Sequence, residues 1–143
     1  MKRALFSAVL AISLLGCGKE VGRIPLASEG AADTTLTLSA GEVSFWTDID
    51  IEWEGDAVLT YKIDLAQGGK SVATAVCDPL GRLPVKTGFV ETNLGDSHTR
   101  KGSGKMECKA TVPAGATAAK VALAFGKKPA KVTLRKVDLV IKQ

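Results

Sequence analysis

Four carboxylates occupy every second position along one short segment of the chain. They are Asp48, Asp50, Glu52 and Glu54. If this segment is a β-strand, alternate side chains point to one face, and the carboxylates project together about 6–7 Å apart. Calcium takes about 6–8 oxygen ligands, many of them from carboxylates, so Asp48 and Asp50 are a candidate pair of calcium ligands. The alternative is a solvated face whose acids pair with lysines of neighbouring strands, such as Lys62 and Lys136.

Trp46 shares the parity of these acids and is therefore expected on the same outward face. An exposed indole beside carboxylates suits a sugar, because the ring packs against apolar C–H patches while the acids accept hydrogen bonds from hydroxyl groups. The candidate ligand-binding residues are Trp46, Asp48, Asp50 and Glu52, with a glycan as the ligand. In the alternative interpretation, Trp46 packs beneath a loop or beneath the N-terminal segment. Trp53 has the opposite parity and is expected in the core.

Catalytic groups do not come together in this sequence. His98 is the single histidine, and its neighbours Asp96 and Ser97 lie in a segment that would not hold a base against a nucleophile. The basic, glycine-rich segment 100–105 lacks the glycine spacing and the serine or threonine of a phosphate-binding loop. It is interpreted as a solvated loop or as a mobile loop in weak contact with anionic lipid. Acids on an open strand face lack the enclosed cleft that raises a carboxyl pKa. The sequence therefore predicts a non-enzymatic protein without a cofactor.

The elements that must position these residues alternate with a period of two. Mostly apolar side chains fill the odd positions from Val43 to Trp53, and similar alternation continues to the end of the chain. The phase slips by one at Arg135-Lys136, which predicts a β-bulge. Gly68-Gly69 predicts a tight hairpin turn. The polar segment 91–105 has no sustained apolar period and is expected to form a long loop.

About eight short strands separated by turns predict an all-β fold, a single antiparallel β-sandwich of the jelly-roll kind. The early "GEVSFWTDIDIEW" and the closing "VTLRKVDLVIKQ" distantly resemble the carbohydrate-binding, galactose-binding-like sandwiches, at the level of architecture alone. No signature motif aligns, so the resemblance assigns no binding residues. An immunoglobulin-like sandwich is the main alternative. Against it, both Trp46 and Trp53 precede Cys77, whereas that fold places a tryptophan between its paired cysteines.

The N-terminus has the layout of a secretory signal peptide. Lys2 and Arg3 precede an apolar run over residues 4–15, which as a helix would reach about 18 Å, short of the ~30 Å hydrocarbon core of a bilayer. Leu14-Leu15-Gly16-Cys17 resembles the lipobox of bacterial lipoproteins. In that family the cysteine thiol receives a diacylglycerol, cleavage follows the glycine, and the new amine is acylated, commonly with palmitate. The resemblance implies a cleaved signal peptide over residues 1–16 and lipidation of Cys17. The alternative is an ordinary secreted protein with a chance cysteine.

Residues 17–33 are expected to form the lipidated N-terminus and either a free tether or a tether whose end lies on the domain as a first edge strand, and residues 34–143 the β-sandwich domain. Pro25, in the short apolar stretch Ile24-Pro25-Leu26, is tolerable only at the edge of a sheet. Two or more acyl chains give stable attachment to a membrane. Gly18 follows the cysteine, where the Gram-negative sorting rule needs an aspartate to retain a lipoprotein at the inner membrane, so the outer membrane is favoured. Cleavage removes Lys2 and Arg3 and lowers the net charge of +4 by two, so a nucleic-acid partner is not expected.

Cys77 and Cys108 remain once Cys17 is assigned to lipid. An even pair of cysteines in an exported chain predicts one disulfide. Metal binding by the pair would need further ligands, and a redox function would need C-x-x-C spacing. Together these features predict a membrane-anchored lipoprotein of the cell envelope with a non-catalytic binding or structural domain. Its expected partners are the membrane, through the lipid anchor, and an envelope protein or a glycan. The alternative function is a carbohydrate-binding module, which would be calcium-dependent if Asp48 and Asp50 ligate the ion.

Overall fold

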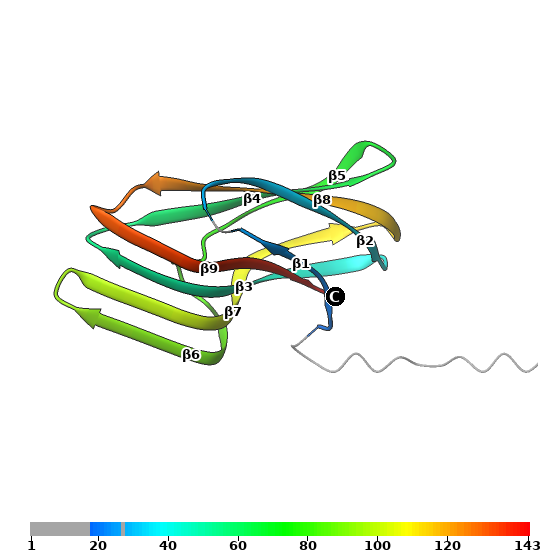
Figure 1. Cartoon of the computed structure of the whole chain (residues 1–143). Helices are drawn as coiled ribbons and strands as arrows, with labels where there is room; N and C mark the ends of the chain where they lie inside the picture. Colours follow the sequence, from blue (N-terminus) through cyan, green and yellow to red (C-terminus); the bar gives the residue numbers. More distant parts are fainter. Residues whose placement is uncertain (1–17, 27) are drawn as a thin grey trace, which may run out of the picture.

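Two antiparallel sheets pack face to face in the computed structural model, which describes residues 18–26 and 28–143 (Figure 1). The five-stranded sheet has the order β1-β9-β3-β7-β6, and the four-stranded sheet has the order β2-β8-β4-β5. The strands are β1 (Glu20–Pro25), β2 (Gly30–Leu38), β3 (Gly41–Glu54), β4 (Val58–Gln67), β5 (Lys70–Cys77), β6 (Val85–Leu94), β7 (Ser97–Val112), β8 (Gly115–Lys127) and β9 (Lys131–Lys142). The predicted all-β sandwich is confirmed. Within the described ranges, no helix has the length and apolar character needed to cross a membrane.

The strand order is that of a jelly roll with one added edge strand. If β6 is left aside, the chain passes between the sheets at every connection except the β4–β5 hairpin, and each sheet keeps four strands. The first and last strands, β1 and β9, pair with each other in the five-stranded sheet. In the immunoglobulin-like fold the strands follow another order within the two sheets, so the observed strand order excludes that alternative.

The core lies between the sheets and follows the predicted parity. On β3 the inward side chains include Val43, Phe45, Ile49 and Ile51, all essentially inaccessible to solvent. They face the buried residues of the other sheet, which include Leu59, Tyr61, Ile63 and Leu65 of β4 and Ala119, Val121 and Leu123 of β8. This complementary burial of two inner faces supplies most of the driving force for folding.

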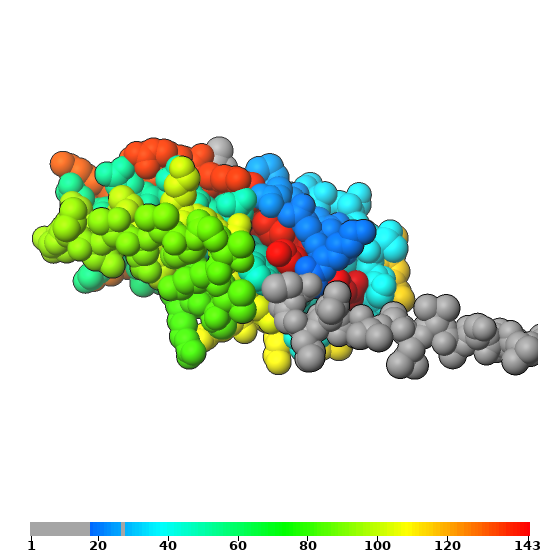
Figure 2. Space-filling view, turned by 90° about the horizontal axis from the view of Figure 1, so that it is seen from below, coloured from blue at the N-terminus to red at the C-terminus, as the bar shows by residue number. Residues whose placement is uncertain are grey.

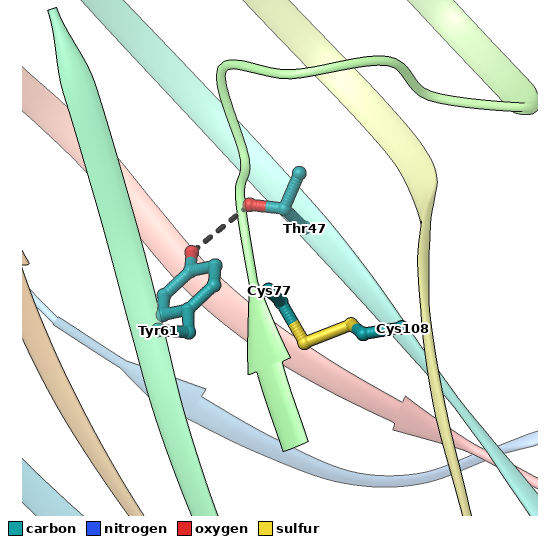
Figure 3. Close-up of a disulfide and its surroundings, with 4 residues drawn as sticks. All are labelled: Thr47, Tyr61, Cys77 and Cys108. Carbon is teal, nitrogen blue, oxygen red and sulfur yellow. Dashed lines mark hydrogen bonds between the residues drawn. A yellow bond between two sulfur atoms is a disulfide. The ribbon is translucent and has the colours of Figure 1, made fainter.

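One hydrogen bond crosses this apolar core. Thr47 Oγ1 and Tyr61 Oη lie 2.9 Å apart, and both side chains are fully buried (Figure 3). Burial raises the pKa of the Tyr61 phenol above its usual range, so the hydroxyl stays protonated. The bond joins β3 to β4 across the two sheets and satisfies two polar groups that would otherwise be stranded in the core.

A disulfide joins the two sheets at one edge. Cys77 ends β5 in the four-stranded sheet, Cys108 lies on β7 in the five-stranded sheet, and their Cα atoms are 5.4 Å apart. Figure 3 shows the sulfur–sulfur bond spanning the gap between these strands. The predicted pairing of the two cysteines is confirmed. Because the chain leaves β5 directly after Cys77 to cross to the other sheet, the bond fixes the point at which the crossing begins.

Two of the four register shifts in the five-stranded sheet involve β3. Asp50 is opposite Lys136 and Ile51 is opposite Leu134, so Arg135 is the extra residue of β9 and the predicted bulge is confirmed. Between β3 and β7 the register also shifts, because a single residue, Phe45, faces the three residues 106–108. Cys108 lies in this irregular stretch.

The long loop expected over residues 91–105 is wrong. These residues belong to β6 and β7, which form a hairpin with a two-residue turn at Gly95-Asp96. Gly95 has a φ of 60°, as the first central residue of a type II′ turn requires. The outward positions Val90 and Leu94 are 62% and 73% exposed, and polar residues fill most of the rest. A strand with so little burial has no apolar alternation from which it could be predicted.

A free tether is wrong for the described part of residues 17–33, whereas the first edge strand considered at its end is present. Residues 20–25 form β1, paired with β9, and residues 30–33 begin β2, paired with β8. Ile24 and Leu26 are buried in the core, while Pro25 lies on an edge strand, where its missing N–H costs nothing. The sandwich therefore begins near Gly18 rather than at residue 34. Cys17 and residues 1–16 lie outside the described residues.

Candidate functional site

The outer face of the five-stranded sheet brings the acids of β3 beside cations of β9. Lys136 Nζ lies 2.8 Å from Asp48 Oδ2. Arg135 contacts Glu52 Oε2 at 2.7 Å and Asp50 Oδ1 at 3.5 Å. Consecutive strand residues normally point to opposite faces, but the bulge at Arg135 lets both cations reach acids on this one face. The expected pairing with Lys136 is present, whereas Lys62 lies on β4 in the other sheet and cannot take part.

Arg23 of β1 is the centre of this charged face. Its Nη1 donates to both Asp48 and Asp138 at 2.9 Å, and its Nη2 donates to Glu20 at 2.8 Å. Asp48 and Asp138 are directly opposite each other on β3 and β9, an arrangement that would be repulsive without the guanidinium. The hydrogen bonds to Glu20 and then Asp48 raise the pKa of Arg23 even further above its usual range.

The same contacts set the protonation state of Asp48. Partial burial alone would raise the pKa of its carboxyl, but hydrogen bonds from Lys136 and Arg23 outweigh burial and hold the pKa below its usual range. Asp48 is therefore ionised and fully engaged at neutral pH. On the same outer face, the hydrogen bond from Arg135 to Glu52 raises the pKa of the Arg135 guanidinium above its usual range.

These ion pairs bear directly on the calcium hypothesis. A calcium ion between Asp48 and Asp50 would have to displace Lys136, Arg23 and Arg135 from their carboxylates. Over residues 18–26 and 28–143, no three His, Cys, Asp or Glu side chains are grouped so as to hold a metal ion. The geometry therefore favours the interpretation of a face of paired charges.

Trp46 is not the exposed aromatic platform that its parity predicted. It does lie on the outer face of β3, but only 2% of its surface is accessible. Lys142 Nζ sits 3.8 Å from the ring centroid in a cation–π contact, and Lys105 of β7 is its cross-strand neighbour. Among the described residues, Nε1 of Trp46 is buried without a hydrogen-bond partner. A sugar has no open ring face to pack against here.

The remaining sequence candidates have structural contacts. Trp53 is half-buried at the margin of the core, where its ring stacks on His98 at a centroid distance of 5.2 Å. His98 also contacts Asn93, with Nδ1 and Oδ1 2.6 Å apart. Arg100, expected in a solvated or mobile loop, is only 9% exposed and donates to the carbonyls of Pro79 and Gly81. It holds the crossing segment against β7 and leaves no free cation at that point.

A shallow depression lies on the outer face of the four-stranded sheet. It has a volume of about 400 Å³, and its floor is made of small residues of β8, Ala116 and Ala118. Asp64 and Ser71, hydrogen-bonded to each other, and Lys120 form part of its polar lining. None of the described residues that line the depression is aromatic. Sequence alternation predicts that such side chains face outward, but it gives no sign that they surround a hollow.

Arg23 and Asp138 were missed by sequence reasoning. Arg23 was placed in the tether, and Asp138 was given no role, although it lies between the buried residues Val137 and Leu139 of β9. The signal that could have found them is the isolated acid within the apolar run of β9, since a nearly buried carboxylate needs a cation. The chain matches no protein-family model, and no curated protein matches it in sequence.

Proposed function

We propose that this protein is a lipid-anchored lipoprotein of the cell envelope whose jelly-roll domain has a non-catalytic binding or structural role at the membrane. The lipobox-like Leu14-Leu15-Gly16-Cys17 supplies the anchor, and Gly18 after the cysteine favours the outer membrane. The chemistry of the described residues supports a role without catalysis. The acids Asp48, Asp50 and Glu52 of β3 are paired with cations, and His98 stacks on a tryptophan.

The observation that carries the proposal is how soon the fold starts after Cys17. The main-chain N of Lys19 donates to the carbonyl of Gln143 at 3.1 Å, so the chain is held in the sheet two residues after the cysteine. Two residues reach at most about 7 Å. A lipidated Cys17 therefore leaves the sandwich no long tether and keeps it against the bilayer, where binding at the membrane surface is favoured by proximity.

The test uses the protein expressed in full from its own signal sequence. The intact mass of the mature protein should fit cleavage before Cys17 with added acyl chains, and the protein should enter the detergent phase of a temperature-induced phase separation. Cys17→Ala should block processing, since the acyl acceptor is lost. A mature protein of unmodified mass that stays in the aqueous phase would remove the proposal.

A glycan-binding role is a second candidate, favoured by the depression on the four-stranded sheet. Asp64, Ser71 and Lys120 offer hydrogen-bonding groups around a floor of alanines small enough to admit a sugar ring. Calorimetric titration of the mature protein with peptidoglycan fragments tests this role. Asp64→Asn should weaken binding at least about tenfold, the loss of roughly 1.4 kcal/mol expected for one hydrogen bond to a charged group. Absence of heat from the unmodified protein counts against this candidate.

A further inference from the structure

Two lysines flank the buried Trp46 at the end of the sandwich where the described chain begins. Lys105 is opposite Trp46 across β3 and β7, and Lys142 is opposite Ser44 across β3 and β9. Lys142 Nζ lies over the indole ring, 3.8 Å from its centroid. Both lysines are half-buried, and within residues 18–26 and 28–143 neither forms an ion pair, whereas most cations on the rest of this face do.

A small hollow of about 180 Å³ lies between these lysines. Its lining residues are Gly18, Glu42, Ser44, Lys105, Lys142 and Gln143. Its single acidic side chain, Glu42, is already within 3.7 Å of Lys109 Nζ. The side chains of the hollow therefore carry an excess of positive charge. The Ser44 hydroxyl donates to the carbonyl of Lys142 at a long 3.4 Å, and rotation about its side-chain bond lets it donate to a bound group instead. Lysine ammonium groups beside a hydroxyl are suited to a phosphate group.

The position of the hollow indicates where such a phosphate would come from. Gly18, one of its lining residues, directly follows Cys17. Figure 1 shows the start of β1 beside the C-terminus, at the end of the sandwich opposite the β6–β7 turn. If Cys17 is lipidated, the hollow lies within one residue, about 3.6 Å of chain, of the membrane surface.

We propose that this hollow binds the phosphate of an anionic membrane lipid through Lys105, Lys142 and Ser44, and so seats the sandwich on the bilayer in one orientation. The inference rests on the lipid anchor of the proposed function and goes beyond it by naming the lipid chemistry and the residues. Trp46 is buried beneath Lys142, so its contribution to the hollow is the cation–π contact that holds this lysine in place. Lysines near an anionic surface contribute about 1 kcal/mol each, which corresponds to about a fivefold preference for the docked orientation per lysine.

The two tryptophans of the chain make the orientation measurable. Trp46 and Trp53 are seven residues apart on β3, so they lie about 24 Å from each other along the strand. The lipidated protein is reconstituted into phosphatidylglycerol or phosphatidylcholine vesicles that contain a lipid with a nitroxide quencher on its headgroup. Trp53→Phe leaves Trp46 as the reporter near the hollow, and Trp46→Phe leaves Trp53 as the distant reference.

We expect stronger quenching of Trp46 in phosphatidylglycerol than in phosphatidylcholine, with little change for Trp53. Lys105→Gln with Lys142→Gln should reduce the docked population about 25-fold relative to the undocked one and abolish the difference between lipids. The matched control, Lys62→Gln with Lys70→Gln, removes two lysines from the four-stranded sheet and should retain the difference between lipids. If the double variant of the hollow fails to fold, Lys105→Gln alone preserves the cation–π contact and should show about a fivefold loss.

Flotation of the vesicles separates this inference from the proposed function. Protein that floats with both lipids but shows equal Trp46 quenching in each has an anchor and no phosphate site, which overturns the inference alone. Equal losses from the hollow variant and the control variant would mean general charge attraction, and would also overturn it. Protein that does not float with either lipid overturns both.

Discussion

Arg23 keeps two facing carboxylates together on the outer face of the five-stranded sheet. Asp48 and Asp138 are cross-strand partners, and each accepts a hydrogen bond from the same Nη1 atom. Since like charges directly opposite each other in a sheet are destabilising, the arginine is needed for this register to be stable.

Arg23→Gln should therefore destabilise the protein by about 1 kcal/mol at neutral pH, a modest value because the arginine is partly exposed. The pKa of Asp48 is lower in the folded protein than in the unfolded chain. The ionised carboxylate therefore contributes to the free energy of unfolding above the ordinary carboxyl pKa of about 4, and this contribution is lost as the pH falls through the pKa of the folded protein. Urea unfolding from neutral to acid pH measures this. The deficit of the variant should shrink below about pH 4, and a deficit that is constant with pH would contradict the assignment.

Thr47 and Tyr61 make the second residue-scale prediction. Tyr61→Phe leaves the Thr47 hydroxyl without its buried partner and should cost about 1–3 kcal/mol in the free energy of unfolding. Thr47→Val with Tyr61→Phe removes both polar groups, so it should recover part of that loss. Additive losses in the double variant would show that the two hydroxyls act independently.

At the scale of elements, the β6–β7 hairpin depends on a close approach of two backbones. Gly102 of β7 has a φ of 134°, and a Cβ there would lie 2.5 Å from the carbonyl oxygen of Gly88 and 2.7 Å from Cα of Phe89. The bulge at Gly88-Phe89 of β6 creates this contact.

Gly102→Ala should thus destabilise the hairpin by about 2 kcal/mol or more, since the contact is with backbone that cannot move aside easily. Gly22→Ala in β1 is the matched control, because its new Cβ would meet side-chain atoms at an ordinary 3.5 Å. Hydrogen exchange should show faster exchange over residues 85–105 in the first variant alone. Equal protection in both would mean that the two strands can separate slightly without cost.

Alternation predicted the strands that bury one face and failed for those that do not. The inward parity of β3, the Gly68-Gly69 turn and the bulge at Arg135 all follow from side-chain period or from glycine chemistry. β6 is an edge strand whose residues are mostly exposed, so it draws stability from pairing with β7 rather than from an apolar face of its own. The alternation of β3 correctly placed Trp46 and the acids on one face of the sheet. It could not show that Arg23 and Arg135 pair with these acids, because that pairing depends on the register of neighbouring strands and on the bulge in β9.

At the scale of the whole molecule, the Cys77–Cys108 bond is the one disulfide cross-link between the sheets in the described chain. It joins residues 31 positions apart, so on the chain-entropy account its loss should cost roughly 3–4 kcal/mol. Cys77→Ser with Cys108→Ser should lower the urea midpoint accordingly, and reductant should shift the midpoint of the original protein but not that of the variant. A midpoint insensitive to reductant would mean that the bond is absent from the native protein.

The turn at Gly95-Asp96 lies at the end of the molecule opposite Gly18 (Figure 1), and in the view of Figure 2 the β6–β7 hairpin again extends away from β1. If the bilayer holds the Gly18 end, this turn stands farthest from it. A short epitope inserted there would disturb no buried side chain and would be displayed to whichever compartment the domain faces. Antibody binding to intact and to permeabilised cells would then reveal the sidedness of the protein in its membrane.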